Sequence, residues 1–241
     1  MTKEEVLNTY DDSYARRYDR TFLLNPEYQF RDKAQFEVRF LKELTSRARS
    51  WLDVACGTGY FLQQARGNSD LKCMGLDLSP AMLAEARHAN PDLEFVEADF
   101  LQPQPSFEGR WEVVTCMWGA YGLQETLADV ETLIENLAKW TTPKGTCFVP
   151  IFDLTIFDER RANGTLMKGV EIDLDRYCWS FVEPDGKRHR EMLAPPVSVM
   201  TAIFERHFGS IESFPYPDAS GMIGIIARKN GPRETANSSP P

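Results

Sequence analysis

Apolar residues follow two different spacings along the chain. Near the N-terminus they recur every four residues: Tyr10, Tyr14 and Tyr18 form one series, and residues 30–44 carry a second. Side chains four residues apart lie on one face of an α-helix. The first 50 residues are therefore predicted to be helical.

From residue 51 onward, short apolar runs bounded by turn residues alternate with helical patterns. Such runs are typical of buried strands, and their alternation with helices indicates βαβ units in a mostly parallel sheet covered on both faces. The predicted strands are residues 51–55, 71–78, 93–96, 111–117 and 146–152, and the predicted helices are residues 60–66, 81–89 and 124–140.

The alternation stops after Asp153. Residues 170–182 and 187–193 are extended runs on either side of the turn signal Pro184-Asp-Gly186, which predicts an antiparallel hairpin inserted after the fifth strand. Three further elements are expected to complete a seven-stranded α/β sheet: a helix over 197–208 and strands over 211–215 and 222–228.

The length predicts one domain over residues 1–229, with a helical cover over residues 1–48. Residues 154–196 are the insertion, and the polar tail over 230–241 is predicted to be disordered. The polar N-terminus carries no apolar leader pattern, and no run of 18 apolar residues occurs. These features predict a cytoplasmic protein.

The net charge of −9 makes the chain poorly suited to nucleic acid or an anionic membrane. Its five cysteines are odd in number and form no C-x-x-C pair, which favours reduced, buried thiols. The spacing of His, Cys, Asp and Glu predicts no metal site.

A glycine-rich turn, Asp53-Val-Ala-Cys-Gly-Thr-Gly59, joins the first strand to a helix. Glycines permit a sharp bend and close approach to a ligand, although such a turn also occurs without one. Asp77 ends the second strand, where a carboxylate can bind ribose hydroxyls; capping the helix that starts at Ser79-Pro80 is its alternative role. A dinucleotide fingerprint requires a third glycine where Leu62 stands, so a nucleoside without a diphosphate is favoured.

These residues resemble a known family. Leu52 to Gly59, LDVACGTG, resembles motif I of the class I S-adenosylmethionine-dependent methyltransferases. Four later segments resemble the motifs that follow it, in the same order: 75–83 (GLDLSPAML), 97–100 (EADF), 111–122 and 143–145. The resemblance implies a Rossmann-like methyltransferase sandwich and S-adenosylmethionine as the cofactor.

A narrower resemblance concerns the amino-sugar N,N-dimethyltransferases of deoxysugar pathways. It rests on LDVACGTG, LDLSPAMLAEARHANPD and VTCMWGAYG, and on Ala15 to Asp19, which is similar to the tyrosine-bearing helix over the methionyl end of the cofactor. By this likeness Tyr18 and Tyr14 contact the carboxylate; helix packing is the alternative for the tyrosines. The resemblance weakens after residue 153, in the part that shapes the acceptor pocket.

The resemblance also implies a set of cofactor-binding residues. Met82 is expected against the adenine and Asp99 near its exocyclic amine. The full set is Tyr14, Tyr18, Asp53, Ala55, Gly57, Gly59, Asp77, Leu78, Met82, Asp99, Phe100, Cys116 and Met117.

Methyl transfer requires alignment of the acceptor with the methyl group, and aromatic faces stabilise a sulfonium. Trp118 and Tyr121 follow the fourth strand, and Trp179 lies in the insertion, so these three are predicted to line the acceptor pocket. Core packing is the alternative for Trp118 and Tyr121. A base is needed when the acceptor carries a proton; the candidates for catalysis are His189, Asp153 and Tyr121.

The predicted function is methyl transfer to a small polar metabolite, with the amine of an amino sugar or a related natural-product intermediate as the first hypothesis. Oxygen and carbon acceptors are alternatives within the same class. A NAD-dependent oxidoreductase and a non-catalytic cofactor-binding module are alternatives from other classes. The expected partner is a small-molecule substrate, without nucleic acid or membrane, and the expected state is a monomer or homodimer.

Overall fold

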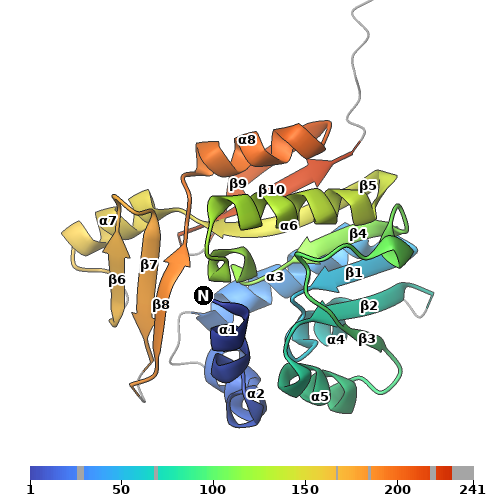
Figure 1. Cartoon of the computed structure of the whole chain (residues 1–241), viewed down its shortest axis with the longest axis horizontal. Coiled ribbons are helices and arrows are strands. Elements are labelled where there is room, and N and C mark those ends of the chain that lie inside the picture. Colours follow the sequence, from blue (N-terminus) through green and yellow to red (C-terminus); the bar gives the residue numbers. More distant parts are fainter. Residues whose placement is uncertain (26–29, 68–69, 167, 184–185, 218–220, 230–241) are drawn as a thin grey trace, which may run out of the picture.

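The computed structural model describes residues 1–25, 30–67, 70–166, 168–183, 186–217 and 221–229. Seven strands form the main sheet, in the order β3-β2-β1-β4-β5-β10-β9 (Figure 1). Strands β1 to β5 are parallel, and β10 runs antiparallel to both of its neighbours. The Rossmann-like sheet expected from the sequence is confirmed. Its strands are β1 (Ser50–Val54), β2 (Lys72–Asp77), β3 (Glu94–Glu97), β4 (Trp111–Cys116), β5 (Thr141–Phe152), β9 (Ser210–Pro215) and β10 (Met222–Arg228).

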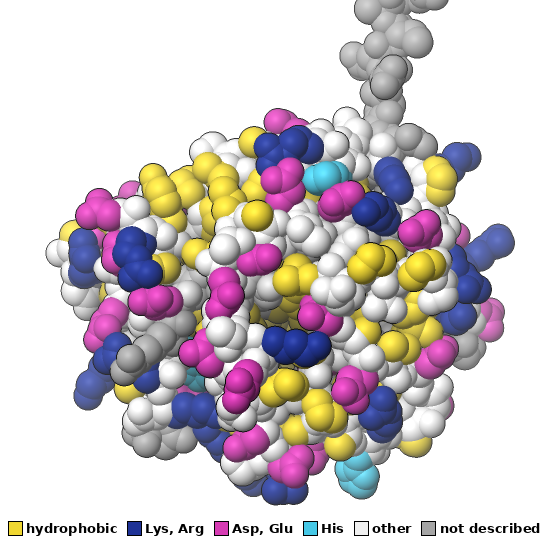
Figure 2. Space-filling view, viewed as in Figure 1, with side chains coloured by type: hydrophobic (Ala, Val, Ile, Leu, Met, Phe, Trp, Pro, Cys, Tyr) yellow, Lys and Arg dark blue, Asp and Glu magenta, His cyan; other side chains and the backbone are white. Residues whose placement is uncertain are grey.

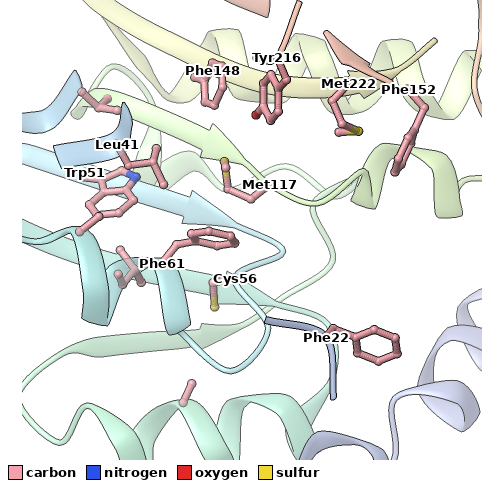
Figure 3. Packing of buried hydrophobic residues seen from close by; sticks show 14 of the residues in the cluster. Phe22, Leu41, Trp51, Cys56, Phe61, Met117, Phe148, Phe152, Tyr216 and Met222 are labelled. Atoms are coloured by element: carbon pink, nitrogen blue, oxygen red, sulfur yellow. The ribbon is translucent and has the colours of Figure 1, made fainter. Parts of the chain in front are cut away.

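Helices cover both faces of this sheet because successive strand residues point to opposite sides. Trp51 and Val113 belong to the core under α3 (Phe30–Thr45), α4 (Tyr60–Ala65) and α5 (Pro80–Ala89). Figure 3 shows part of this core, with Leu41 of α3 beside Trp51. The following residues, Leu52 and Val114, belong to the second core, under α6 (Leu127–Trp140) and α8 (Val197–His207).

Capping side chains fix where two of these helices begin. Ser79 accepts a hydrogen bond from the N–H of Met82 at 3.2 Å, and Pro80 occupies the first position of α5. Thr126 and Asp129 form a reciprocal capping box at the start of α6. Helix α6 therefore begins three residues later than predicted, after a short 3-10 turn, η3 (Ala120–Leu123). A second such turn is η2 (Pro105–Phe107).

The N-terminal tyrosines do not lie on one continuous helix. The chain forms α1 (Lys3–Thr9), α2 (Asp12–Tyr18) and a π-helical turn, η1 (Asp19–Leu23). The break occurs because the Asp11 carboxylate caps α2, accepting the N–H of Tyr14 at 2.9 Å. The three phenol rings still cluster, with centroids 5.3–6.5 Å apart.

The insertion after β5 has three strands where a hairpin of two was expected. It contains α7 (Leu154–Ala162) followed by a separate antiparallel sheet of β6 (Val170–Asp173), β7 (Cys178–Val182) and β8 (Arg188–Leu193). The run over 170–182 divides because Asp173 Oδ1 accepts the N–H groups of Asp175 and Arg176, which turns the chain. Pro184 and Asp185 of the expected turn, and the tail over 230–241, lie outside the described residues.

The start of β5 also differs from the expectation. Residues 142–145, which precede the predicted strand over 146–152, lie within β5 as a bulge. Trp111 of β4 pairs with Thr141, whereas Val113 pairs with Thr146. The extra residues therefore bend one strand without ending it.

The insertion sheet packs closely against η3, and this contact predicts a steric effect. A Cβ on Gly122 would lie 2.7 Å from the backbone oxygen of Leu193 in β8. Gly122→Ala should lower the free energy of unfolding by about 1–2 kcal/mol, because backbone must move to admit the methyl group. Urea unfolding would measure the loss.

The control for this prediction is Gly67→Ala, because a Cβ there would meet nothing within 4 Å. Equal stability of the two variants would show that β8 yields to the methyl group without cost.

Candidate active site

The turn after β1 has the left-handed backbone that its sequence suggested. Ala55, Gly57 and Gly59 have φ of +55°, +56° and +73°. A Cβ on Gly57 would lie 3.1 Å from Cε of Met82. Glycine at this position therefore keeps the turn close to α5 and leaves room in the cavity that both residues line.

Asp77 stands at the carboxyl end of β2 and lines the same cavity. Its Oδ2 accepts the N–H of Gly57 and its Oδ1 accepts the N–H of Ser79, each at 2.8 Å. Burial raises the pKa of Asp77, and the N–H donors of Ser79 and Gly57 oppose that rise. The carboxylate keeps acceptor capacity for a ligand hydroxyl, because its two oxygens offer about four lone-pair sites and the backbone N–H groups of Gly57, Ser79 and Leu78 do not fill them all.

One part of the cavity is lined by apolar side chains and a carboxylate. Leu78, Met82 and Phe100 line it, together with Asp99. Asp99 Oδ1 accepts the N–H of Leu101 at 2.9 Å, and its Oδ2 lies 3.7 Å from Nζ of Lys3 in α1. The site can hold a planar heterocycle with an exocyclic amine.

The N-terminal segment is tied directly to the glycine turn through η1 and to the start of α5 through the residue that ends α1. Thr58 donates its hydroxyl to Asp19 Oδ1 at 2.5 Å, and Ser79 donates its hydroxyl to the carbonyl oxygen of Tyr10 at 2.8 Å. Tyr14 and Tyr18 line the cavity beside this junction. Burial raises the pKa of both phenols, so they remain protonated donors.

Another part of the cavity has aromatic walls and two basic side chains. Lys33 of α3 is buried, with Nζ 3.6 Å from the centroid of the Trp118 ring and 3.8 Å from Glu37 Oε1. Trp118 donates its indole N–H to Glu37 Oε2 at 2.7 Å. His189 is the second basic group. The aromatic side chains lining this part are Phe22, Trp118, Phe152, Trp179 and Phe181.

The structure brings thirteen of the residues predicted from the sequence to one cavity of about 300 Å³. They are Tyr14, Tyr18, Ala55, Gly57, Asp77, Leu78, Met82, Asp99, Phe100, Met117, Trp118, Trp179 and His189. Among the described residues, no group of three or more His, Cys, Asp or Glu side chains is arranged to hold a metal ion.

Five predicted site residues do not line this cavity. Tyr121 is fully buried and its hydroxyl accepts the N–H of Phe152 at 2.9 Å, which makes it a core residue. Asp153 caps α7 by accepting the N–H of Thr155 at 2.9 Å. The remaining three are Asp53, Gly59 and Cys116.

Asp53 is buried in β1 and bonded to the neighbouring strand β4. Its Oδ1 accepts the hydroxyl of Thr115 at 2.6 Å, and Thr115 in turn accepts the indole N–H of Trp51 at 2.9 Å. Oδ2 is buried without a partner among the described residues. Burial raises the pKa of Asp53 to about 7, against the opposing bond from Thr115. This carboxyl therefore stabilises β1 against β4 best when it is protonated.

Sequence reasoning missed several polar groups of the site. Lys33 and Glu37 are four residues apart on one helix, a spacing that signals an ion pair. Glu183 and Arg17, which contact one another across the molecule, gave no such signal because 166 positions separate them.

The family described as a methyltransferase domain matches residues 52–145. This stretch of the chain is therefore similar to a methyltransferase domain. The matched range contains the glycine turn, Asp77 and Asp99, so the domain supplies much of the cavity wall.

Characterised relatives match this methyltransferase domain and its surroundings. An N,N-dimethyltransferase of dTDP-3-amino-3,6-dideoxy-α-D-glucopyranose from Streptomyces fradiae is 31% identical over 140 residues, covering 58% of this chain and 53% of that protein. A trans-aconitate 2-methyltransferase from Klebsiella pneumoniae is 36% identical over 146 residues, covering 60% and 50%. The chain thus spans about half the length of these relatives.

Solved structures resemble the fold over most of this chain. The PH0226 protein of Pyrococcus horikoshii superposes with a TM-score of 0.69 at 16% identity, covering 90% of this chain and 99% of that one. CalS10, an amino pentose methyltransferase from Micromonospora echinaspora solved with S-adenosylmethionine bound, superposes with a TM-score of 0.62 at 18% identity, covering 85% and 93%. The resemblance read from the sequence motifs is confirmed.

Proposed function

We propose that this chain transfers the methyl group of S-adenosylmethionine to the amine of a small polar metabolite. The observation that carries the proposal is the position of Asp77, whose carboxylate lines one cavity with the left-handed Gly57 turn and an apolar slot. Asp77 would bind the ribose hydroxyls, Met82 and Leu78 the adenine, Asp99 its amine, and Tyr18 the methionyl carboxylate. When bound, S-adenosylmethionine supplies a methyl group activated by a positively charged sulfur.

The protein's own contribution is orientation and exclusion of water. Trp118 is fixed by its indole bond to Glu37, and Phe152 and Trp179 pack with ring centroids 4.6 Å apart. These rigid aromatic walls favour a cation and hold an acceptor in one orientation. Orientation of this kind contributes roughly 7–11 kcal/mol to lowering a barrier in favourable cases.

An amino sugar linked to a nucleotide is the first acceptor we propose, because three of the relatives are named as N,N-dimethyltransferases of dTDP-linked amino sugars. The single domain over residues 1–229 would use residues 1–48 to cover the cofactor and residues 154–196 to shape the acceptor pocket.

No helix within the described residues is both long and apolar enough to cross a membrane. On the face seen in Figure 2, acidic and basic side chains are interspersed. We propose a cytoplasmic monomer or homodimer that acts on a small molecule and not on nucleic acid.

Calorimetry and an acceptor screen test this function. The protein should bind S-adenosylhomocysteine, and it should transfer a labelled methyl group to an amine in a panel containing dTDP-3-amino-3,6-dideoxy-α-D-glucopyranose and trans-aconitate. Heat with NAD and none with S-adenosylhomocysteine would instead identify an oxidoreductase. Binding without turnover of any acceptor would favour a cofactor-binding module.

A further inference from the structure

A buried network of polar side chains joins α2 to the insertion sheet, and two of its members, Tyr14 and His189, line the cavity. Nε2 of His189, in β8, lies 2.5 Å from Oε1 of Glu183 and 3.2 Å from the hydroxyl of Tyr14. Oε2 of Glu183 accepts a hydrogen bond from Nη1 of Arg17 at 2.9 Å. Glu183 is 2% exposed and His189 is 6% exposed, so the network is shielded from bulk water.

The charge state of Glu183 determines which nitrogen of His189 carries the proton. Burial opposes ionisation of Glu183, but the hydrogen bonds from His189 and Arg17 outweigh it and lower its pKa. An ionised carboxylate only accepts hydrogen bonds, so Nε2 of His189 must be the protonated nitrogen. The lone pair of a neutral imidazole then lies on Nδ1.

Nδ1 of His189 is the nitrogen that this network leaves available. Both hydrogen bonds of the ring use Nε2, and Nδ1 contacts no donor or acceptor within the described residues. The ring lines the cavity together with Trp179 and Met192.

We propose that His189 is the general base that accepts the proton of the acceptor amine, and that Glu183 is the positioning residue that fixes its tautomer. This inference rests on the proposed function. The ammonium group of the acceptor gives one proton to Nδ1, its freed lone pair forms the nitrogen–carbon bond, and the carbon–sulfur bonding pair stays on sulfur. The imidazolium then returns the proton to water.

The surroundings of His189 suit a group that gains a positive charge during turnover. Glu183, after β7, supplies the negative charge, and Arg17 and Tyr14 of α2 complete its hydrogen bonding. Lys187 is a further cation on this side, with Nζ 3.8 Å from the centroid of the Tyr14 ring and donating to the carbonyl oxygen of Thr9. This arrangement holds an imidazole by its carboxylate neighbour, as in catalytic triads.

The first test requires no acceptor. The chain has three histidines, so nitrogen NMR of the whole protein with S-adenosylhomocysteine can be assigned using His88→Gln and His207→Gln. We expect the neutral His189 ring to carry its proton on Nε2, and Glu183→Gln to weaken that preference. A proton on Nδ1 in the unaltered protein would overturn the proposal.

The second test measures turnover with dTDP-3-amino-3,6-dideoxy-α-D-glucopyranose, or with whichever amine of the panel the unaltered protein methylates. His189→Gln keeps a side chain that can donate to Glu183 but removes the proton acceptor. We expect kcat to fall at least about 100-fold, with the dissociation constant of S-adenosylhomocysteine changed less than about twofold. His207→Gln is the matched control and should retain full turnover, because His207 lies on α8 beside Glu131.

Failure of the role of His189 can be distinguished from failure of the proposed function. A His189→Gln protein with a kcat within about threefold of the original would overturn the role of His189 and leave the proposed function standing. If circular dichroism shows that this variant does not fold, Glu183→Gln is measured instead. We expect its kcat to fall about tenfold. A kcat equal to that of the original protein would count against the proposal. Absence of S-adenosylhomocysteine binding, or of turnover by the unaltered protein, would count against the proposed function, and the NMR tautomer would then decide the role of His189.

Discussion

Asp53→Asn should make the protein more stable above neutral pH and remove much of the fall in stability that the original protein shows as pH rises. The carboxyl is fully buried, and burial raises its pKa from 3.8 to about 7. Between these two values the folded protein binds a proton that the unfolded chain has released. Stability contributed by Asp53 is therefore present below about pH 4 and is lost as pH rises through about 7. This difference in pKa between the unfolded and the folded protein corresponds to about 4 kcal/mol in the free energy of unfolding.

Urea unfolding at several pH values between 4 and 8 checks this expectation. Asparagine does not titrate and keeps an oxygen that accepts the Thr115 hydroxyl, so its stability should change less with pH over this range. Asp92→Asn is the control, because Asp92 is exposed and its pKa is lowered by Arg66. Parallel stability curves for Asp53→Asn and the original protein would contradict a raised pKa at Asp53.

Asp77→Ala is expected to weaken binding of S-adenosylhomocysteine by about 5- to 150-fold, which is about 1–3 kcal/mol. The substitution removes the acceptors proposed for the ribose hydroxyls. It also removes the partners of the Gly57 and Ser79 N–H groups, which hold the glycine turn against α5. Isothermal titration calorimetry would give the dissociation constant.

Two further variants complete this experiment. Asp77→Asn retains one acceptor oxygen and should lose less affinity than alanine. Asp92→Ala removes a carboxylate that is paired with Arg66 on the surface and should bind like the original protein. An unchanged dissociation constant for a folded Asp77→Ala protein would mean that the ligand does not use this carboxylate.

The parts of the fold and site that could be predicted depend on neighbours in sequence. The strand ending in the Gly57 turn and the helix starting at Ser79-Pro80 are specified by a few adjacent residues. Most of the site residues found from sequence follow β1, β2, β3 and β4 for the same reason. Parallel strands bring their carboxyl ends to one edge, so position along the chain sufficed.

The parts that could not be predicted depend on which way a side chain points and on contacts between residues far apart in the sequence. Trp118 and Tyr121 are three residues apart, but the left-handed backbone at Trp118 and Gly119 leaves one in the cavity and the other in the core. Asp153 follows the end of β5, and its carboxylate caps the start of α7. The contact of Tyr14 with His189 joins residues 175 positions apart, which no local pattern encodes.

The ties between the first helices and the insertion also bear on how the protein matures during synthesis. Arg17 is paired with Glu183, and the carbonyl of Thr9 is bonded by Lys187, across 166 and 178 positions. The ribosome releases α1 and α2 long before their partners exist, and long-range contacts form late because loop closure must come first. Helices α1 and α2 are therefore expected to reach their folded positions among the last elements. In a nascent chain stopped before residue 183, they should remain accessible to protease.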